Sequence, residues 1–141
     1  MNLSLTPIRF LLWAADEYGS KVGVVDGDQR LTYRELLDRS SRLAAALGGL
    51  GVKAGDRVAS LSLNCHQLLE AYYGVPIARA ILLSLNVRLS TEEQAYILEH
   101  SGTKLVLFDP ELLPLAAGLH AKRPDVLWIS LRPHKELPDW V

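Results

Sequence analysis

Strand-like and helix-like segments alternate four times after residue 33, and this order limits the fold more than any other feature of the sequence. Four short runs are nearly continuously apolar, as buried strands are: 57–63, 81–85, 104–108 and 126–131. Stretches with apolar residues at helical spacing stand between them. Such alternation predicts an α/β fold with a mostly parallel β-sheet and helices on both of its faces.

The N-terminal part predicts a β-hairpin ahead of this unit. Two β-prone runs, 22–25 and 30–33, flank the sequence Asp-Gly-Asp at 26–28. An Asp-Gly pair suits a tight hairpin turn because glycine accepts a positive φ at little cost. Before the hairpin, residues 8–18 have the apolar spacing of a short amphipathic helix, and Thr6 with Pro7 forms its start.

Short polar side chains mark where later helices begin. Thr32 with Glu35, and Ser90 with Glu93, have the spacing of a capping box, in which each residue's side chain bonds the other's backbone N–H. Asn64 follows the first of the four strands and is expected to cap the next helix. These caps support the predicted order of strands and helices.

The chain of 141 residues has the size of one domain. Residues 1–131 hold all the predicted elements and are expected to form one α/β domain. Residues 132–141 are polar and interrupted by proline, which predicts a polar tail.

Composition excludes several classes of function. Lys and Arg number 15 against 16 Asp and Glu, so no basic excess favours nucleic acid as a partner. The single cysteine, Cys65, forms no internal disulfide, and the scattered histidines predict no metal site. A reducing cytoplasm is the expected compartment. No stretch approaches the roughly 20 apolar residues of a membrane span.

The glycines at 48, 49, 51 and 55 do not form a phosphate-binding loop. A dinucleotide fingerprint needs its glycines between a strand and the following helix, where backbone N–H groups meet the phosphates. Here the glycines follow a predicted helix and precede a strand. Termination of that helix is the preferred interpretation.

Two sets of residues remain as candidates for chemistry. Cys65 lies at a predicted helix start, where a thiol can be activated, but no base or orienting group is evident, and burial as a small side chain is preferred. Asn64, Asn86 and Asp109 follow predicted strands, so they are candidates for lining a pocket at the carboxyl ends of the sheet. Capping and turn formation explain the same three residues.

Several segments resemble one known family. Residues 24–59 contain LTYREL, which is similar to the L-T-Y-x-E-L signature of acyl-CoA synthetases in the adenylate-forming, AMP-binding superfamily. Residues 64–90 and 95–109, with LEAYYGVP, LNVRL and HSGTKLVLFD, look most like the fatty-acid CoA ligase branch. The resemblance implies the N-terminal subdomain of the large domain of such an enzyme.

This resemblance implies ATP, magnesium and coenzyme A as cofactors of the full-length enzyme. Family members bind them with T-S-G-T-T-G-x-P-K-G, with Y-G-x-T-E, and with a ribose-binding aspartate and a C-terminal lysine, and none of these elements occurs here. No catalytic, cofactor-binding or metal-binding residue is therefore assigned, and no cofactor is expected for this chain alone. We expect an N-terminal fragment of an AMP-dependent fatty-acyl-CoA synthetase, inactive by itself. The alternative is a stand-alone α/β module that binds a ligand or a protein.

The resemblance also bears on partners and on two unusual residues. A fragment is expected to expose an apolar face, through which it forms a homodimer or docks to the missing remainder of the synthetase. Arg79 stands where relatives usually have glycine, and Ser84 stands where many have proline. A buried arginine at position 79 would be costly.

Overall fold

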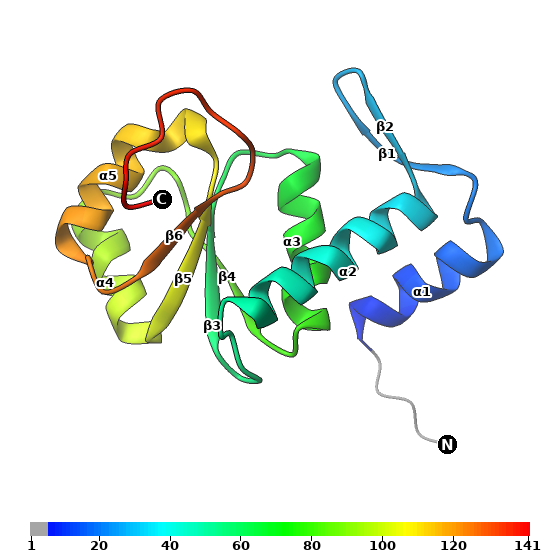
Figure 1. The fold of residues 1–141 in the computed structure, drawn as a ribbon, viewed down its shortest axis with the longest axis horizontal. Helices are drawn as coiled ribbons and strands as arrows, with labels where there is room; N and C mark the ends of the chain where they lie inside the picture. Colours follow the sequence, from blue (N-terminus) through cyan, green and yellow to red (C-terminus); the bar gives the residue numbers. More distant parts are fainter. Residues whose placement is uncertain (1–5) are drawn as a thin grey trace.

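The computed structural model describes residues 6–141, which form a four-stranded parallel sheet covered by helices, with a hairpin and a helix at one end (Figure 1). The elements in chain order are α1 (Pro7–Glu17), β1 (Val22–Asp26), β2 (Gln29–Thr32), α2 (Tyr33–Gly49), β3 (Arg57–Leu61), α3 (His66–Ile77), β4 (Ile81–Ser84), α4 (Thr91–Ser101), β5 (Thr103–Phe108), the 3-10 turn η1 (Pro110–Leu112), α5 (Leu113–Lys122) and β6 (Leu127–Ser130).

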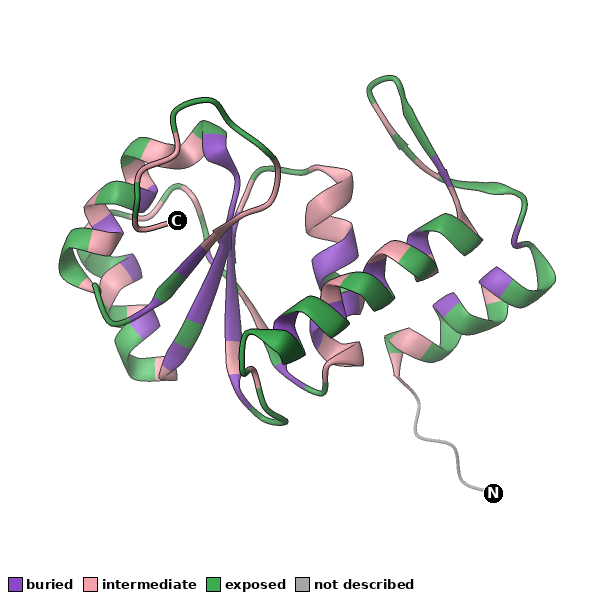
Figure 2. Cartoon of the chain, in the orientation of Figure 1, coloured by how far each residue is buried: buried purple, intermediate pink, exposed green. Residues whose placement is uncertain are grey.

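The main sheet has the strand order β4-β3-β5-β6, and all three pairings are parallel. Helices α2 and α3 lie on one side of the sheet, and α4 and α5 lie on the other (Figure 1). The central strands β3 and β5 are the most buried elements (Figure 2). The predicted α/β class, with helices on both faces, is confirmed.

Alternating side chains of β5 supply the two hydrophobic cores. Leu105 and Leu107 point to the side of α2 and α3, where they join Leu47 and Val75. Val106 and Phe108 point to the opposite side, which is closed by α4 and α5. Because successive side chains of a strand face opposite ways, a strand buried on both faces is apolar along its length. This explains why KLVLF contains no polar residue after its lysine.

The hairpin forms as predicted but remains a separate two-stranded sheet. Its turn contains Gly27, whose φ of 55° lies in the left-handed region. Helix α1 packs on α2 and α3 through Leu11 and Ala15 (Figure 2). The hairpin and α1 therefore lie on the outer side of α2 and α3, away from the main sheet (Figure 1).

Both capping boxes are present. The Thr32 hydroxyl accepts from the backbone N–H of Glu35, and the carboxylate of Glu35 accepts from the backbone N–H of Thr32. Ser90 and Glu93 do the same at the start of α4. These bonds satisfy backbone donors that a helix start leaves without partners.

The prediction that Asn64 caps α3 is wrong. The N-cap residue is Cys65, and its side chain makes no capping bond. Instead, the backbone N–H of His66 donates to Oδ2 of Asp26 at 2.9 Å. The cap therefore comes from the hairpin, 40 residues earlier in the chain. The sequence around the start of α3 does not indicate this partner.

The segment 132–141 folds back over the α5 side of the sheet. Its sequence is polar, yet Leu137, Trp140 and Val141 pack against the core there. The Trp140 ring stacks on His120 of α5, with 4.4 Å between ring centroids and 12° between planes. This segment therefore belongs to the packed part of the molecule in spite of its composition.

Candidate functional site

The carboxyl edge of the sheet is the place where this topology favours a ligand. After β3 the chain turns to α3 on one face, whereas after β5 it turns to α5 on the other. Adjacent strands whose connections leave in opposite directions open a crevice beyond their carboxyl ends. In this chain that position lies between the loop 62–65, which follows β3, and Asp109, which follows β5.

The three residues predicted to line a pocket have different roles. Asn64 lines two hollows near the start of α3. Asn86 forms a turn, because its Oδ1 accepts from the backbone N–H of Arg88 at 3.0 Å. Asp109 caps η1, accepting from the backbone N–H of Glu111 at 3.0 Å. Neither Asn86 nor Asp109 lines the two hollows at Asn64.

Asp109 is a buried carboxylate that is fully paired. Arg132, just after β6, donates to it at 2.8 Å and also to the exposed Glu111 at 2.8 Å. The hydrogen bond to Asp109 holds the pKa of Arg132 above its usual range. Arg132 was not predicted as a site residue, although its position just after a strand, like that of Asp109, could have indicated it. This pair joins the carboxyl ends of β5 and β6.

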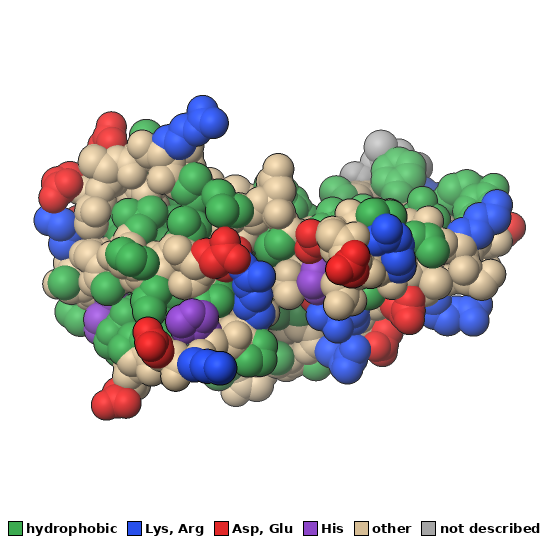
Figure 3. Space-filling view, turned by 90° about the horizontal axis from the view of Figure 1, so that it is seen from above, with side chains coloured by type: hydrophobic (Ala, Val, Ile, Leu, Met, Phe, Trp, Pro, Cys, Tyr) green, Lys and Arg blue, Asp and Glu red, His purple; other side chains and the backbone are tan. Residues whose placement is uncertain are grey.

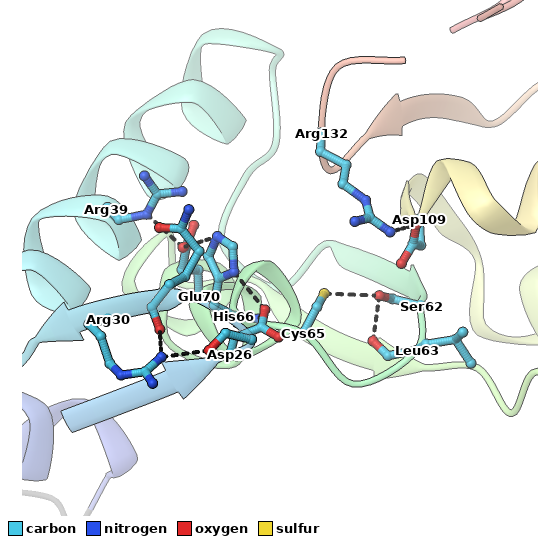
Figure 4. A network of polar contacts seen from close by, with 12 residues as sticks. Asp26, Arg30, Arg39, Ser62, Leu63, Cys65, His66, Glu70, Asp109 and Arg132 are labelled. Carbon is cyan, nitrogen blue, oxygen red and sulfur yellow. Dashed lines mark hydrogen bonds and ion pairs between the residues drawn. The ribbon is translucent and has the colours of Figure 1, made fainter. Parts of the chain in front are cut away.

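Cys65 is half-buried, and among residues 6–141 its side-chain hydrogen-bond partner is Ser62 rather than a base. Its Sγ lies 3.5 Å from the hydroxyl of Ser62, which in turn donates to the carbonyl of Leu63 (Figure 4). His66 follows Cys65 in sequence, but its imidazole is turned to Asp26. The geometry therefore gives no support to a thiol nucleophile activated by histidine.

A chain of polar side chains joins the hairpin, α3 and α2 (Figure 4). Nδ1 of His66 lies 2.7 Å from Oδ2 of Asp26, and its Nε2 lies 4.0 Å from Oε1 of Glu70. Glu70 is 7% exposed and is paired with Arg39 at 2.6 Å. The hydrogen bonds from the backbone and side chain of His66 lower the pKa of Asp26, and the positive charge of Arg132 acts in the same direction.

Two hollows adjoin this network. The first, of about 230 Å³, lies between β1 and the start of α3 and is lined by Val24, Val25, Asp26, Asn64, Cys65, His66 and Leu69. The second, of about 210 Å³, continues along α3 to Tyr72. Asn64, Cys65 and Leu69 line both hollows. The network and the first hollow were not predicted, because their residues come from the hairpin and from α3, which are far apart in sequence. The second hollow is lined by residues 64–72 alone.

The comparisons with known proteins decide the family. A sequence model described as AMP-binding enzyme matches residues 11–138. The chain belongs to the AMP-binding enzyme family. This confirms the resemblance that LTYREL and the later segments indicate.

Relatives of this AMP-binding chain are acyl-CoA ligases. A long-chain-fatty-acid–CoA ligase of Thermus thermophilus is 48% identical over 93 residues, which cover 66% of this chain and 17% of the relative. An acetate/butyrate–CoA ligase of Arabidopsis thaliana, named as peroxisomal, is 34% identical over 137 residues, covering 90% and 24%. The chain thus spans at most 24% of the length of these two curated relatives.

A solved structure supports the same assignment. The O-succinylbenzoate coenzyme A synthetase of Bacillus subtilis, determined with ATP and magnesium, superposes with a TM-score of 0.77 at 26% identity. The match covers 86% of this chain and 32% of that protein. Family members therefore bind ATP and magnesium, and their N-terminal part has the fold found here.

The residues of this AMP-binding chain do not fit ATP or magnesium at the carboxyl edge. The loop after β3 reads Ser-Leu-Asn-Cys, so it offers no glycine-rich cradle for phosphates. The acids at this edge, Asp26 and Asp109, are already paired with His66 and Arg132. Within residues 6–141, no three His, Cys, Asp or Glu side chains gather in a way that would hold a metal ion.

The length and composition of the helices indicate whether any of them could cross a membrane. Among the helices from α1 to α5, none combines the length and the apolar character that crossing a bilayer requires.

Proposed function

We propose that this chain is the N-terminal structural module of a ligase that activates fatty acids with ATP and transfers them to coenzyme A. In such an enzyme the fatty carboxylate attacks the α-phosphate of ATP, pyrophosphate leaves, and the thiol of coenzyme A then displaces AMP. The family match over residues 11–138 supports the reaction class. The 48% identity to a relative named for long-chain fatty acids supports the substrate class.

The module is proposed to be inactive by itself and to bind no ATP, magnesium or coenzyme A alone. One observation carries this proposal: the polar side chains at the carboxyl edge bind one another. Asp109 holds Arg132, Asp26 holds His66, and Ser62 contacts Cys65. Groups that are paired in this way are costly to turn toward a new ligand, because each would lose a charge-assisted or buried hydrogen bond.

ATP–pyrophosphate exchange with a series of fatty acids tests this directly. The 141-residue chain is expected to give no exchange above the blank, and a complete relative serves as the positive control. Clear turnover by the isolated chain would overturn the proposal.

The module is further proposed to offer an apolar surface to a partner, either a second copy or the remaining part of a ligase. Exposed apolar side chains gather at the end formed by the hairpin and α1 (Figure 3). Phe10 is 61% exposed, Trp13 56% and Val25 63%. Sedimentation velocity is expected to show either self-association of the chain or its binding to the added remaining part of a ligase. A chain that stays monomeric and does not bind that part would contradict this proposal.

A second candidate is a stand-alone binding module, and the hollow beside Asn64 and Cys65 favours it. Titration calorimetry with ATP, AMP, coenzyme A and a fatty acid separates the two candidates. The module of a ligase is expected to give no heat with the nucleotides, whereas saturable heat with any of the four ligands favours the binding module. The single cysteine fits a reducing compartment, for which we propose the cytoplasm.

A further inference from the structure

The hairpin is attached to the rest of the molecule chiefly at its base. Val22 pairs with Thr32, and the backbone N–H of Tyr33 donates to the carbonyl of Lys21 at 3.1 Å. The pairing of the two strands is interrupted at Gly23. A two-stranded hairpin is at most marginally stable by itself, so its outer part depends on other contacts.

Few of those contacts are apolar. Leu31 is the one residue of β1 and β2 that is buried, and it lies next to the start of α2. Val25, close to the turn, is 63% exposed. Beyond Leu31, the outer part of the hairpin therefore gains little from burial.

Asp26 makes the hydrogen bonds that join this outer part to α3 within the described residues. Its Oδ2 accepts from the backbone N–H of His66 at 2.9 Å and lies 2.7 Å from Nδ1 of the same residue. A carboxylate at a helix start is also favoured by the helix dipole. One side chain thus both caps α3 and holds the hairpin.

The imidazole of His66 is held in place from its other side. Glu70 lies 4.0 Å from Nε2 and is itself bound to Arg39 of α2. Helix α3 is anchored in the core by Ala71 and Val75, which are fully buried. The α3 side of the contact is therefore anchored in the core, whereas the hairpin side has few buried contacts of its own.

A hollow lies directly behind the hairpin. Its walls are Val24, Val25 and Asp26 from β1, and Asn64, Cys65, His66 and Leu69 from the start of α3. Moving the hairpin outward removes the β1 wall and leaves the α3 wall in place. Cys65, half-buried now, would then lose its cover on the side of β1 and become more exposed.

We propose that the β1–β2 hairpin is a flap over the start of α3, with its pivot at the base, its latch at Asp26 and His66, and Cys65 beneath it. Opening breaks the two hydrogen bonds of Asp26 and leaves both hydrophobic cores intact. The flap is thus a local opening that does not require unfolding of the sheet. It controls access to the hollow at the carboxyl edge.

The rate at which iodoacetamide alkylates Cys65, followed by intact mass, measures this opening in the full chain. Asp26→Ala is expected to raise that rate about tenfold, because losing a helix cap and its hydrogen bonds shifts the opening equilibrium by about one decade. The matched control is Asp38→Ala, which removes one carboxylate from an exposed ion pair with Arg42 on α2. The control is expected to alkylate at the rate of the unaltered chain.

Amide hydrogen exchange separates a flap from general loosening. In Asp26→Ala, the amides of residues 24–31 are expected to exchange faster, while those of Val58 and Val106 in the sheet keep their rates. Equal alkylation of Asp26→Ala and the unaltered chain would overturn the proposal. If the amides of Val58 and Val106 exchanged faster by the same factor as those of residues 24–31, this result would overturn the proposal as well.

A measurement on the unaltered chain covers the case in which Asp26→Ala does not fold. In low concentrations of denaturant, a flap exposes little new surface, so exchange of residues 24–31 is expected to depend weakly on denaturant. Exchange of these amides with the same strong dependence as Val58 and Val106 would show that the hairpin opens only by global unfolding, against the proposal.

Discussion

At the scale of single residues, Arg79 is the most unusual feature of the chain. It follows α3 with a φ of 63°, the left-handed region that L-residues avoid. The backbone N–H of Arg79 donates to the carbonyl of Pro76, and that of Ala80 donates to the carbonyl of Val75. These two bonds form a Schellman motif, which requires a left-handed residue at this point.

The left-handed backbone at position 79 favours glycine, in agreement with the glycine that the family resemblance implies there. Gly51 closes α2 in the same way, with a φ of 84°. The side chain of Arg79 is exposed, so the expected cost of a buried arginine does not arise. The strain lies in the backbone instead.

Arg79→Gly is therefore expected to raise the free energy of unfolding by about 1 kcal/mol, as left-handed strain of 1–2 kcal/mol is relieved and part is offset by the freedom of glycine in the unfolded chain. Urea denaturation measures it. Arg79→Ala is the control and should change stability little, since alanine keeps the strain. A less stable Arg79→Gly variant would refute this account.

At the scale of elements, the crossing of α2 and α3 depends on Gly74. A Cβ built on Gly74 would lie 2.9 Å from the backbone carbonyl oxygen of Ser40 and 2.9 Å from Cδ2 of Leu43. Because the Ser40 oxygen belongs to the backbone, a change of side-chain rotamer cannot relieve this contact. The two helices therefore approach as closely as they do because this position has no side chain.

Gly74→Ala is expected to lower the free energy of unfolding by about 1–2 kcal/mol, because overpacking at the crossing exceeds the helix propensity that alanine gains. Gly48→Ala in α2 is the matched control, since nothing lies within 4 Å of its added Cβ. That variant should be more stable by about 0.5–1 kcal/mol. Thermal or urea unfolding of both variants gives the comparison, and equal signs for the two would contradict this explanation.

At the scale of the whole molecule, the C-terminal segment closes the α5 side of the sheet. Trp140 stacks on His120 and lies edge-on to Trp128, whose ring centroid is 5.9 Å away. Trp128 of β6 is fully buried. The last residues of the chain thus cover the core from the end opposite to α1 and the hairpin (Figure 1).

Trp140→Ala is expected to lower the free energy of unfolding by about 2 kcal/mol, through lost apolar burial and lost ring contacts. Residues 132–141 should then become sensitive to brief proteolysis while the sheet remains resistant. Lys135→Ala, at an exposed position of the same segment, is expected to change neither property. Equal proteolysis of this segment in all three proteins would show that Trp140 does not anchor it.

Much of the fold could be predicted because it depends on local chemistry. The apolar run KLVLF, the Asp-Gly turn and the two capping boxes act through neighbours a few residues apart, and each has the structure that its sequence predicts. Family membership likewise follows from strings such as LTYREL. Local backbone hydrogen bonding and side-chain periodicity are properties of short segments, so they can be predicted from the sequence of each segment.

The candidate site was decided by tertiary structure. Asp26 caps a helix that begins 40 residues later, and Arg132 reaches Asp109 across 23 residues. Asp26, and not the expected Asn64, accepts a hydrogen bond at the start of α3, because tertiary packing brings the hairpin there. Helical periodicity and local caps determined the helices of this protein. Only the tertiary structure determined the partners of Asp26 and Asp109, because those partners depend on which distant segments packing brings together.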